Sequence, residues 1–245
     1  MKISVITCTY NSSKYIKENM ESVWNQSIKP HEQIIVDAGS TDDTLKIIKK
    51  YKGNIKIIHR DPMGISDAMN FGIKNARGDV IQILHSDDYN IDMNLYSKVE
   101  KLFTGSNVKW LYGYTHSVDE NGTRIAVQPH PLFRKYSYLK LRLISFIPHP
   151  SVFLRKSVFE RFGYFREDLK ITMDYEYWLR IGKKLRPVVI PSFWTAFRVH
   201  SEGMSTKNNT NSKMKKELKK FLGVWYYPHW FVSFVIRGLY GKTRL

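Results

Sequence analysis

The sequence predicts an α/β fold in which a mostly parallel sheet carries helices on both faces. Two observations predict it: strand and helix signals alternate over the first hundred residues, and polar residues follow directly where apolar strands end. Such alternation is typical of βαβ units with right-handed crossovers. The chain has 245 residues, 42% of them hydrophobic, which is enough for one large domain or two small ones.

Four short apolar runs predict the strands of the parallel part of the sheet. They are residues 3–10 (ISVITCTY), 33–37 (QIIVD), 55–59 (IKIIH) and 80–84 (VIQIL). The last run is apolar except for Gln82, which is continuous enough for a strand that is covered on both faces.

The first helix is expected soon after the first strand. Ile16, Met20, Val23 and Trp24 recur at the spacing of one helix face. One of residues 11–13 (Asn-Ser-Ser) is expected to cap this helix, because such side chains accept hydrogen bonds from the free N–H groups of a helix N-terminus.

The second helix has the clearest boundaries in the sequence. Ser40 and Asp43 resemble a capping box, the first turn is acidic, the last turn is basic, and Gly53 ends the segment. Residues 64–79 predict a third helix, closed by Gly78.

Beyond residue 89 the regular alternation is lost. A helix is expected near residues 94–103, and residues 112–127 predict a hairpin with Asn121–Gly122 at its turn. Residues 148–165 predict a strand and a short helix, and residues 173–184 predict a helix with acids in its first turn. This half is therefore expected to add antiparallel strands to the sheet.

Charge and cysteine content limit the setting of the protein. A formal net charge of +17 would attract nucleic acid, anionic lipid or phosphorylated small molecules. The single cysteine, Cys8, excludes an internal disulfide and fits a reducing compartment. A short apolar strand follows Met1 and Lys2 where a signal peptide would have a longer apolar core, so we expect a cytoplasmic protein.

Polar side chains follow three of the four predicted strands. Residues 9–11 end the first strand, Asp37 ends the second, and Asp87 and Asp88 follow the fourth. Ligands of open α/β sheets collect at the carboxyl ends of strands, so we expect these residues on one rim. Adjacent carboxylates repel unless a cation lies against them, which favours a metal site over a merely solvated turn.

Five segments in this order resemble one enzyme family: SVITCTYN, IIVDAGSTDDT, GISDAMNFGIKNARGDVIQILHSDD, MDYEYWLRIG and FRVHSEGMS. Over residues 1–205 the sequence is similar to the inverting family 2 glycosyltransferases of bacterial glycan and polysaccharide synthesis. The resemblance implies the GT-A fold, a Rossmann-like mixed sheet with helices on both faces. It also implies transfer of a hexosyl or N-acetylhexosaminyl group from a nucleotide diphosphate sugar to a hydroxyl of a glycan or lipid-linked acceptor. UDP is the default nucleotide, with GDP and dTDP open.

The resemblance also implies roles for individual residues. It assigns Thr9 and Asp37 to the nucleobase and ribose end of the donor, and it puts Asp67 and Asn70 beside the nucleotide and sugar. The full set expected to bind the nucleotide sugar is Thr9, Tyr10, Asn11, Asp37, Asp67, Asn70 and Asp87.

Asp87 and Asp88 match the family's D-x-D metal motif, in which Ser86 here replaces the first acid. The match implies that Asp88 binds Mg²⁺ or Mn²⁺ and that Asp87 binds ribose or sugar hydroxyls. It places His200 near the metal or the diphosphate. Both metals accept one or two carboxylates and fill their remaining positions with phosphate and water, which one short acidic motif can satisfy.

Asp174 aligns with the family's catalytic base, although Met173 stands where an acid often precedes it. An acid in the first turn of a helix is also favoured electrostatically whatever its role, and Glu176 is the alternative base. His149, between two prolines, is expected either to contact the acceptor or phosphate or to be structural. His85 is expected to pack under the acidic pair.

The chain is expected to divide into a GT-A domain (1–205) and a basic amphipathic C-terminal helical tail (206–245). Within the domain, a nucleotide-sugar half (about 1–115) precedes an acceptor and catalytic half (about 116–205). Residues 213–245 hold eight basic residues and one acid.

The tail also has a helical apolar pattern, which Pro228 is expected to break. We expect it to lie on an anionic membrane surface at the inner face of the cell membrane. The alternatives are packing on the domain and contact in a dimer. The residues that recur at helical spacing are Met214, Leu218, Phe221, Leu222 and Trp225.

Two other function classes stay open. A pI near 9.8 and many aromatic residues fit a nucleic-acid-binding protein, but the sequence has no nucleic-acid motif and its acidic rim repels phosphate without a metal. A nucleotidyltransferase acting on a sugar phosphate would use a similar rim. Its usual glycine-rich, basic phosphate loop is absent from the sequence TCTYNSS.

Overall fold

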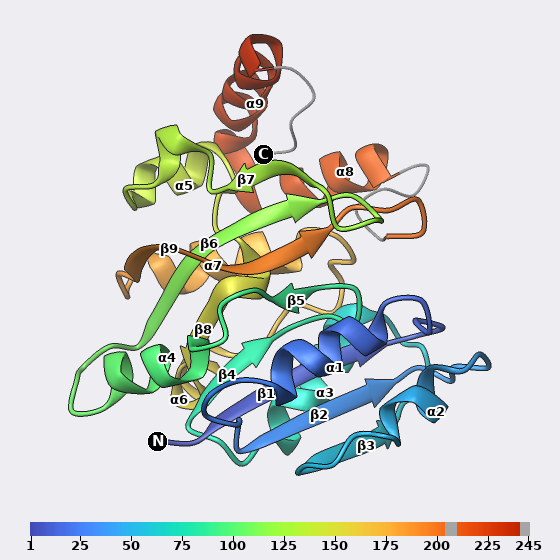
Figure 1. The fold of residues 1–245 in the computed structure, drawn as a ribbon. Coiled ribbons are helices and arrows are strands. Elements are labelled where there is room, and N and C mark those ends of the chain that lie inside the picture. The colour runs from blue at the N-terminus through green and yellow to red at the C-terminus, as the bar shows by residue number, and fades with distance from the viewer. Residues whose placement is uncertain (204–209, 241–245) are drawn as a thin grey trace.

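Within residues 1–203 and 210–240, which the computed structural model describes, nine strands form one mixed sheet (Figure 1). Its order is β3-β2-β1-β4-β8-β6-β9-β5, and β7 pairs with β6. The neighbours among β1 to β4 are parallel, as predicted, and β8 pairs antiparallel with both β4 and β6. The strands are β1 (Ile3–Thr9), β2 (Glu32–Asp37), β3 (Ile55–His59), β4 (Val80–Ile83), β5 (Tyr89–Asn90), β6 (Trp110–Val118), β7 (Arg124–Gln128), β8 (Val152–Arg155) and β9 (Val188–Arg198).

The predicted helices are present, but α2 is much shorter than predicted, because it covers five residues of the expected segment from Ser40 to Gly53. A short helix, α5, was not predicted. Short 3-10 turns lie at Pro131–Phe133, His149–Ser151 and Gly223–Trp225. The α-helices are α1 (Ile16–Trp24), α2 (Thr44–Ile48), α3 (Ile65–Asn75), α4 (Leu95–Phe103), α5 (Tyr138–Leu143), α6 (Lys156–Phe162), α7 (Met173–Gly182), α8 (Thr210–Leu222) and α9 (Tyr226–Tyr240).

Alternate residues of the parallel strands face two separate cores. Ile6 of β1 packs in one core with Ile73 of α3, whereas its neighbour Val5 packs in the other with Met20 of α1 and Val99 of α4. Side chains of a strand alternate between the faces of a sheet, so this sheet is buried on both sides. The prediction of helices on both faces is confirmed.

The cap predictions for the first two helices are wrong. Tyr15 precedes α1 and makes no side-chain capping bond. Before α2, the Ser40 hydroxyl donates to the Asp37 carboxylate at 2.6 Å, and Asp43 makes no capping bond either. Asp42 instead accepts the N–H of Thr44 at 3.0 Å. The loop after β2 competes with the helix for Ser40, and that competition depends on tertiary structure.

The tail consists of helices α8 and α9, and α8 packs on the main body. Leu218 and Leu222 are buried in the same core as residues of α7. The chain turns at Gly223, with φ at +53°, so the prediction that Pro228 breaks the helix is wrong. Pro228 lies in the first turn of α9, where its missing N–H is not needed.

The two predicted domain boundaries have different outcomes. The boundary between the domain and the tail, at 205/206, falls within residues 204–209, which lie outside the described residues. The boundary near residue 115 falls inside β6, which continues to Val118 and is hydrogen-bonded along its length to β9. The two proposed halves therefore share one sheet. In the described part of the chain, no helix is both long and apolar enough to cross a bilayer.

Candidate active site

The loops after β1 and β2 are tied together at the sheet's carboxyl rim. Asn11 adopts a left-handed conformation, with φ at +45°, and its side-chain oxygen accepts the N–H of Thr41 at 2.8 Å. Its own N–H donates to the Ser40 hydroxyl at 2.9 Å. The buried Asp37 carboxylate accepts the N–H groups of Gly39 and Ser40 at 3.0 and 3.1 Å. Asn11 and Asp37 thus shape these loops directly.

Thr9 and Tyr10 provide free groups at the same rim. Thr9 is buried, and its hydroxyl has no hydrogen-bond partner among the described residues. Tyr10, the next residue, is 60% exposed. The hydroxyls of Ser12 and Ser86 lie 2.8 Å apart, which joins this loop to the acidic loop after β4. The rim therefore brings together the ends of β1, β2 and β4, as the sequence predicts.

Asp67 and Asn70, on α3, already have protein partners. The Asp67 carboxylate forms two hydrogen bonds of 2.9 Å with the Arg60 guanidinium, which lowers the pKa of Asp67. The Asn70 amide donates to the carbonyl of Phe165 and to the Glu167 carboxylate, and it accepts the N–H of Phe165. Asn70 therefore holds the loop that precedes α7, and its expected place beside the donor remains a prediction.

Asp87 and His200 form a pair across the rim. The His200 Nε2 lies 2.9 Å from the Asp87 Oδ2. Burial acts to raise the pKa of Asp87, but the hydrogen bond with His200 holds it below its ordinary value. The structure thus brings Asp87 and His200 together, with the histidine on Asp87 instead of Asp88.

Asp88 lies deeper, at 1% exposure. Its Oδ1 accepts the backbone N–H of Arg198 at 3.0 Å. Burial, together with the charge of Asp87, raises the pKa of Asp88 well above its ordinary value. A buried carboxylate in this state would be stabilised in its ionised form by a cation.

These carboxylates fit a magnesium or manganese ion. No group of three or more His, Cys, Asp or Glu side chains in the described part of the chain is arranged to hold a metal by itself. Such an ion bound with a nucleotide needs only one or two carboxylates, and it prefers oxygen ligands. Asp87 and Asp88 have such oxygens, and the raised pKa of Asp88 shows that burial and the charge of Asp87 destabilise its ionised form in the protein alone.

Arg198 is a structural part of the site that the sequence pattern did not reveal. Its guanidinium donates to the carbonyl groups of Asp87, Asp119 and Glu120 and forms an ion pair with Glu18. Arg198 lies in the segment FRVH, two residues before His200. Its closeness in sequence to His200 was the only sequence signal for its role.

Asp174 lies in the first turn of α7, as predicted. Its side chain is 30% exposed, and its Oδ1 accepts the N–H of Tyr175 at 2.7 Å. Burial raises the pKa of Asp174 to about 6. The carboxylate is therefore a much better proton acceptor than a solvated aspartate.

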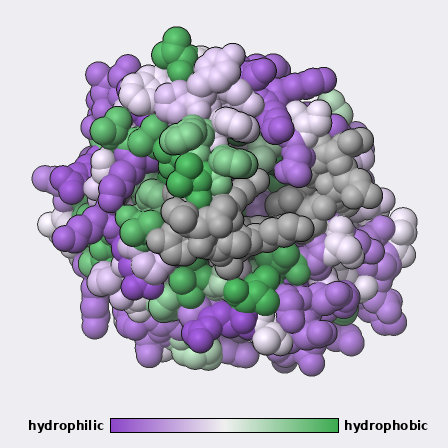
Figure 2. Space-filling view, turned by 90° about the horizontal axis from the view of Figure 1, so that it is seen from above, coloured by the Kyte–Doolittle hydropathy of each residue, from purple (hydrophilic) through white to green (hydrophobic). Residues whose placement is uncertain are grey.

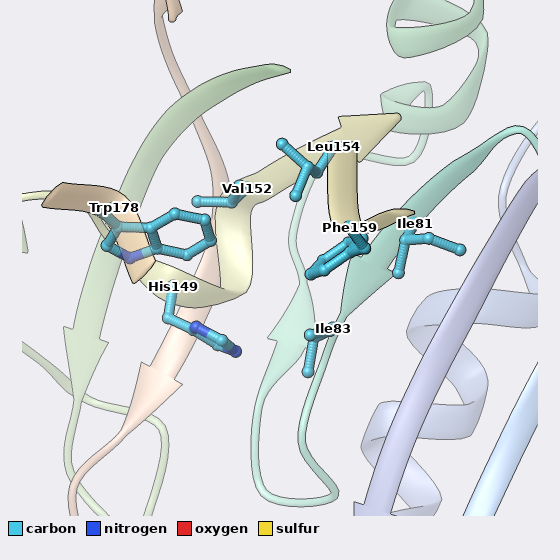
Figure 3. Close-up of a pocket in the computed structure, with 7 residues that line it drawn as sticks. All are labelled: Ile81, Ile83, His149, Val152, Leu154, Phe159 and Trp178. Carbon is cyan, nitrogen blue, oxygen red and sulfur yellow. The ribbon is translucent and has the colours of Figure 1, made fainter. Parts of the chain in front are cut away.

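His149 lies against Asp174 and links it to the acidic loop. The His149 Nδ1 is 4.0 Å from the Asp174 Oδ2, and the His149 ring stacks on His85 with 5.4 Å between ring centres. Burial lowers the pKa of His149 to about 4, so the ring is neutral at pH 7 and forms no ion pair with Asp174. His149 lines a small, mostly apolar pocket (Figure 3) together with Ile81, Ile83, Val152, Leu154, Phe159 and Trp178.

His85 therefore stacks on a second histidine, a contact that sequence reasoning missed. The stack runs from the loop that carries Asp87 to the residue beside Asp174. The candidate metal site and the candidate base thus lie on the two sides of one pair of neutral rings.

The chain matches the model of a known family and resembles many curated proteins. The family model described as Glycosyl transferase family 2 matches residues 4–163. An uncharacterized glycosyltransferase of Methanocaldococcus jannaschii is 28% identical over 239 residues, which cover 93% of this chain and 79% of the relative. The chondroitin synthase of Escherichia coli is 29% identical over 185 residues, which cover 74% of this chain and 26% of that protein.

Solved structures show the same fold. TarS residues 1–349 of S. aureus, in complex with UDP-GlcNAc, align with a TM-score of 0.72 and 26% identity, covering 88% of this chain and 65% of that one. The mannosyltransferase PcManGT of Pyrobaculum calidifontis, in complex with GDP-Man and Mn²⁺, aligns with a TM-score of 0.64 and 15% identity, covering 98% of this chain and 76% of that one.

Several relatives are longer than this chain. It spans 38% of the length of a Rickettsia conorii glycosyltransferase to which it is 28% identical, and less than two thirds of the TarS fragment. The family model nevertheless matches well over half of the chain, and the mixed α/β sheet agrees with the GT-A structures. The protein therefore belongs to family 2 of the glycosyltransferases.

Proposed function

We propose that this glycosyltransferase transfers a hexosyl or N-acetylhexosaminyl group from a nucleotide diphosphate sugar to a hydroxyl of a glycan or lipid-linked acceptor, with inversion. The observation that carries the proposal is the placement of Asp174, an ordinarily weak base whose pKa is raised to about 6, across a histidine stack from the acidic loop. The UDP-GlcNAc complex of TarS supports a UDP-sugar as the donor.

Asp174 would accept the proton of the acceptor hydroxyl. As that proton leaves, the acceptor oxygen forms a bond to the anomeric carbon, and the bond from this carbon to the diphosphate oxygen breaks. A base with a pKa of about 6 is mostly ionised at pH 7 and still holds a proton well. The acceptor and the leaving group lie on opposite sides of the sugar in a single displacement, which inverts the anomeric centre.

A divalent metal ion, Mg²⁺ or Mn²⁺, would be held by Asp88, with Asp87 and His200 beside it. When bound, such an ion neutralises negative charge on a diphosphate leaving group. The Mn²⁺ in the PcManGT complex supports this expectation for the fold. The best candidates for contacts with the nucleotide are Thr9, whose hydroxyl has no hydrogen-bond partner among the described residues, and the exposed Tyr10.

The direct test is to incubate the protein with Mn²⁺, an acceptor mixture and a panel of UDP-, GDP- and dTDP-sugars. We expect release of nucleoside diphosphate, and we expect Asp174→Asn to bind the donor without transferring the sugar. Glu176→Gln is the matched control, because Glu176 forms an ion pair with Arg180. Pyrophosphate release would instead indicate a nucleotidyltransferase, and tight DNA retention without turnover would indicate a nucleic-acid-binding protein.

We also propose that α9 attaches the enzyme peripherally to the anionic, cytoplasmic face of a membrane. Large apolar side chains of this helix are exposed, although α8 packs on the core. Seen from the α9 end, groups of hydrophobic side chains lie near the centre of the face, and most of its outer edge is hydrophilic (Figure 2). The exposed residues include Tyr227, Trp230, Phe231 and Phe234.

The lysines of α8 supply the charge for this attachment. Lys213, Lys215, Lys216, Lys219 and Lys220 are all exposed. Each basic residue near an anionic surface contributes on the order of 1 kcal/mol. The full-length protein is expected to sediment with phosphatidylglycerol vesicles but not with phosphatidylcholine vesicles. Phe231→Ser with Phe234→Ser should weaken this binding, and unchanged sedimentation of the double variant would refute the attachment.

A further inference from the structure

Glu217 is a buried acid on the lysine-rich helix α8. It is 7% exposed, whereas its neighbour Lys216 is exposed to solvent. Glutamate is almost never buried without partners, because removing its charge from water is costly. The partners of Glu217 therefore indicate what this helix contributes to the protein.

Three consecutive residues donate four hydrogen bonds to the Glu217 carboxylate. Its Oε1 accepts the N–H of Lys170 at 2.7 Å. Its Oε2 accepts the N–H of Ile171 at 3.1 Å, the N–H of Thr172 at 2.9 Å and the hydroxyl of Thr172 at 2.8 Å. An acceptor with two oxygens and several lone pairs suits this convergence of donors.

These residues lead directly into α7. Thr172 is the N-cap residue of that helix, and its side chain makes no capping bond of the ordinary kind, since its hydroxyl donates to Glu217. A helix N-terminus has unsatisfied N–H groups and a partial positive charge. Glu217 supplies an acceptor and a negative charge there from 45 residues further along the chain.

Asp174 lies two residues beyond Thr172. Its carboxylate accepts the N–H of Tyr175, so its direction depends on the backbone at the start of α7. We propose that Glu217 is a positioning residue for Asp174, and that α8 is therefore part of the catalytic machinery as well as of the tail. This inference rests on the proposed function of Asp174 as the base.

The charge of Glu217 also acts on Asp174. Among the described residues, the titratable side chains that contact Asp174 or act on its charge include His149, His85 and Glu217. Burial lowers the pKa of each histidine to about 4, so both rings are neutral at pH 7. Burial is the main reason for the raised pKa of Asp174, and the negative charge of Glu217 raises it further. Removal of that charge should make Asp174 a weaker base.

The test compares Glu217→Gln with Lys216→Gln, which neutralises the exposed neighbour on the same helix. We expect kcat of Glu217→Gln to fall about 10- to 100-fold, because small displacements of a catalytic group cost this much. The donor KM should stay close to that of the wild type, and the acidic limb of the pH profile should move to lower pH. In an assay without vesicles, where membrane attachment plays no part, Lys216→Gln should change none of these. A wild-type kcat with an unshifted acidic limb in Glu217→Gln would overturn the proposal.

Glu217→Asp separates charge from position. It keeps the carboxylate but shortens the side chain by one methylene, so kcat should fall while the acidic limb stays in place. If Glu217→Gln does not fold, as judged by circular dichroism, this variant carries the test. A wild-type kcat in Glu217→Asp would then overturn the positioning role.

Amide hydrogen exchange tests the inference separately from the proposed function. In Glu217→Gln, exchange should become faster at Ile171, Thr172 and Tyr175, and it should be unchanged in Lys216→Gln. If the wild type released no nucleoside diphosphate, the proposed function would fail. The amide exchange rates would still show whether Glu217 orders the start of α7. An unchanged Tyr175 amide in Glu217→Gln would then show that Glu217 does not position Asp174.

Discussion

Replacing Asp174 by asparagine is expected to stabilise the fold at neutral pH while it stops transfer. Asparagine has nearly the shape of aspartate, and its oxygen can still accept the N–H of Tyr175. What disappears is a partly buried negative charge with no cationic partner among the described residues, since His149 beside it is neutral at pH 7. Active-site charges of this kind commonly lower stability in return for function.

The size of the effect follows from the pKa of Asp174, which burial raises from 3.8 to about 6. The folded protein binds this proton more tightly than the unfolded chain, so stability is lost as the pH rises from near 4 through 6. The full difference corresponds to about 3 kcal/mol, of which about half is already lost at pH 5 and nearly all by pH 7. The side chain is 30% exposed, so water reduces this to about 1–3 kcal/mol.

Urea denaturation of the two proteins at pH 5 and pH 8 measures the difference. The free energy of unfolding of Asp174→Asn should exceed that of the wild type by more at pH 8 than at pH 5. Asp168→Asn is the control, because Arg166 lowers the pKa of Asp168 to about 2 and its neutralisation should give no such gain. Parallel pH dependences for Asp174→Asn and the wild type would refute the argument that Asp174 is a buried, uncompensated base.

Three further predictions concern the same site. The kcat/KM of the wild type should fall about tenfold per pH unit below pH 6, as Asp174 becomes protonated, and a flat profile down to pH 5 would contradict this. Asp88→Asn should abolish the gain in donor affinity that Mn²⁺ provides in calorimetry, and an undiminished gain would remove Asp88 from the metal site. Asn70→Ala should lower the free energy of unfolding by on the order of 3 kcal/mol, because it removes two buried hydrogen bonds to Phe165 and a partly buried one to Glu167. Urea denaturation measures this, and a loss below about 1 kcal/mol would contradict it.

Local sequence patterns predicted the elements whose signals are local. The parallel strands follow from short apolar runs, and helices α3, α4, α6 and α7 follow from local signals such as glycines at helix ends and acids in the first turn; they lie within or near the predicted segments. The caps of α1 and α2 were not predictable in this way. Ser40 bonds to Asp37 and the N–H of Ser13 bonds to Asp42, and both contacts depend on loops that meet only in the folded sheet.

The site was predictable only in part for the same reason. The acidic pair stood out because two adjacent carboxylates after an apolar strand are unusual. The contact between Asp87 and His200 joins residues 113 apart in sequence, and the stack of His85 on His149 has no local signal. In the sequence, Glu217 is a single acid in a basic tail. Nothing local indicates the four hydrogen bonds that residues 170–172 donate to its carboxylate.

The position of β9 has a consequence for the order of assembly. It is the last strand in the described part of the sequence, yet it pairs with both β6 and β5. It therefore lies inside the sheet, between two strands that precede it in the chain. Arg198 ends it and His200 follows, and the backbone N–H of Arg198 holds Asp88. A chain still on the ribosome lacks these groups until its last quarter has emerged. The acidic loop therefore reaches its final geometry only after β9 has joined the sheet, late in synthesis.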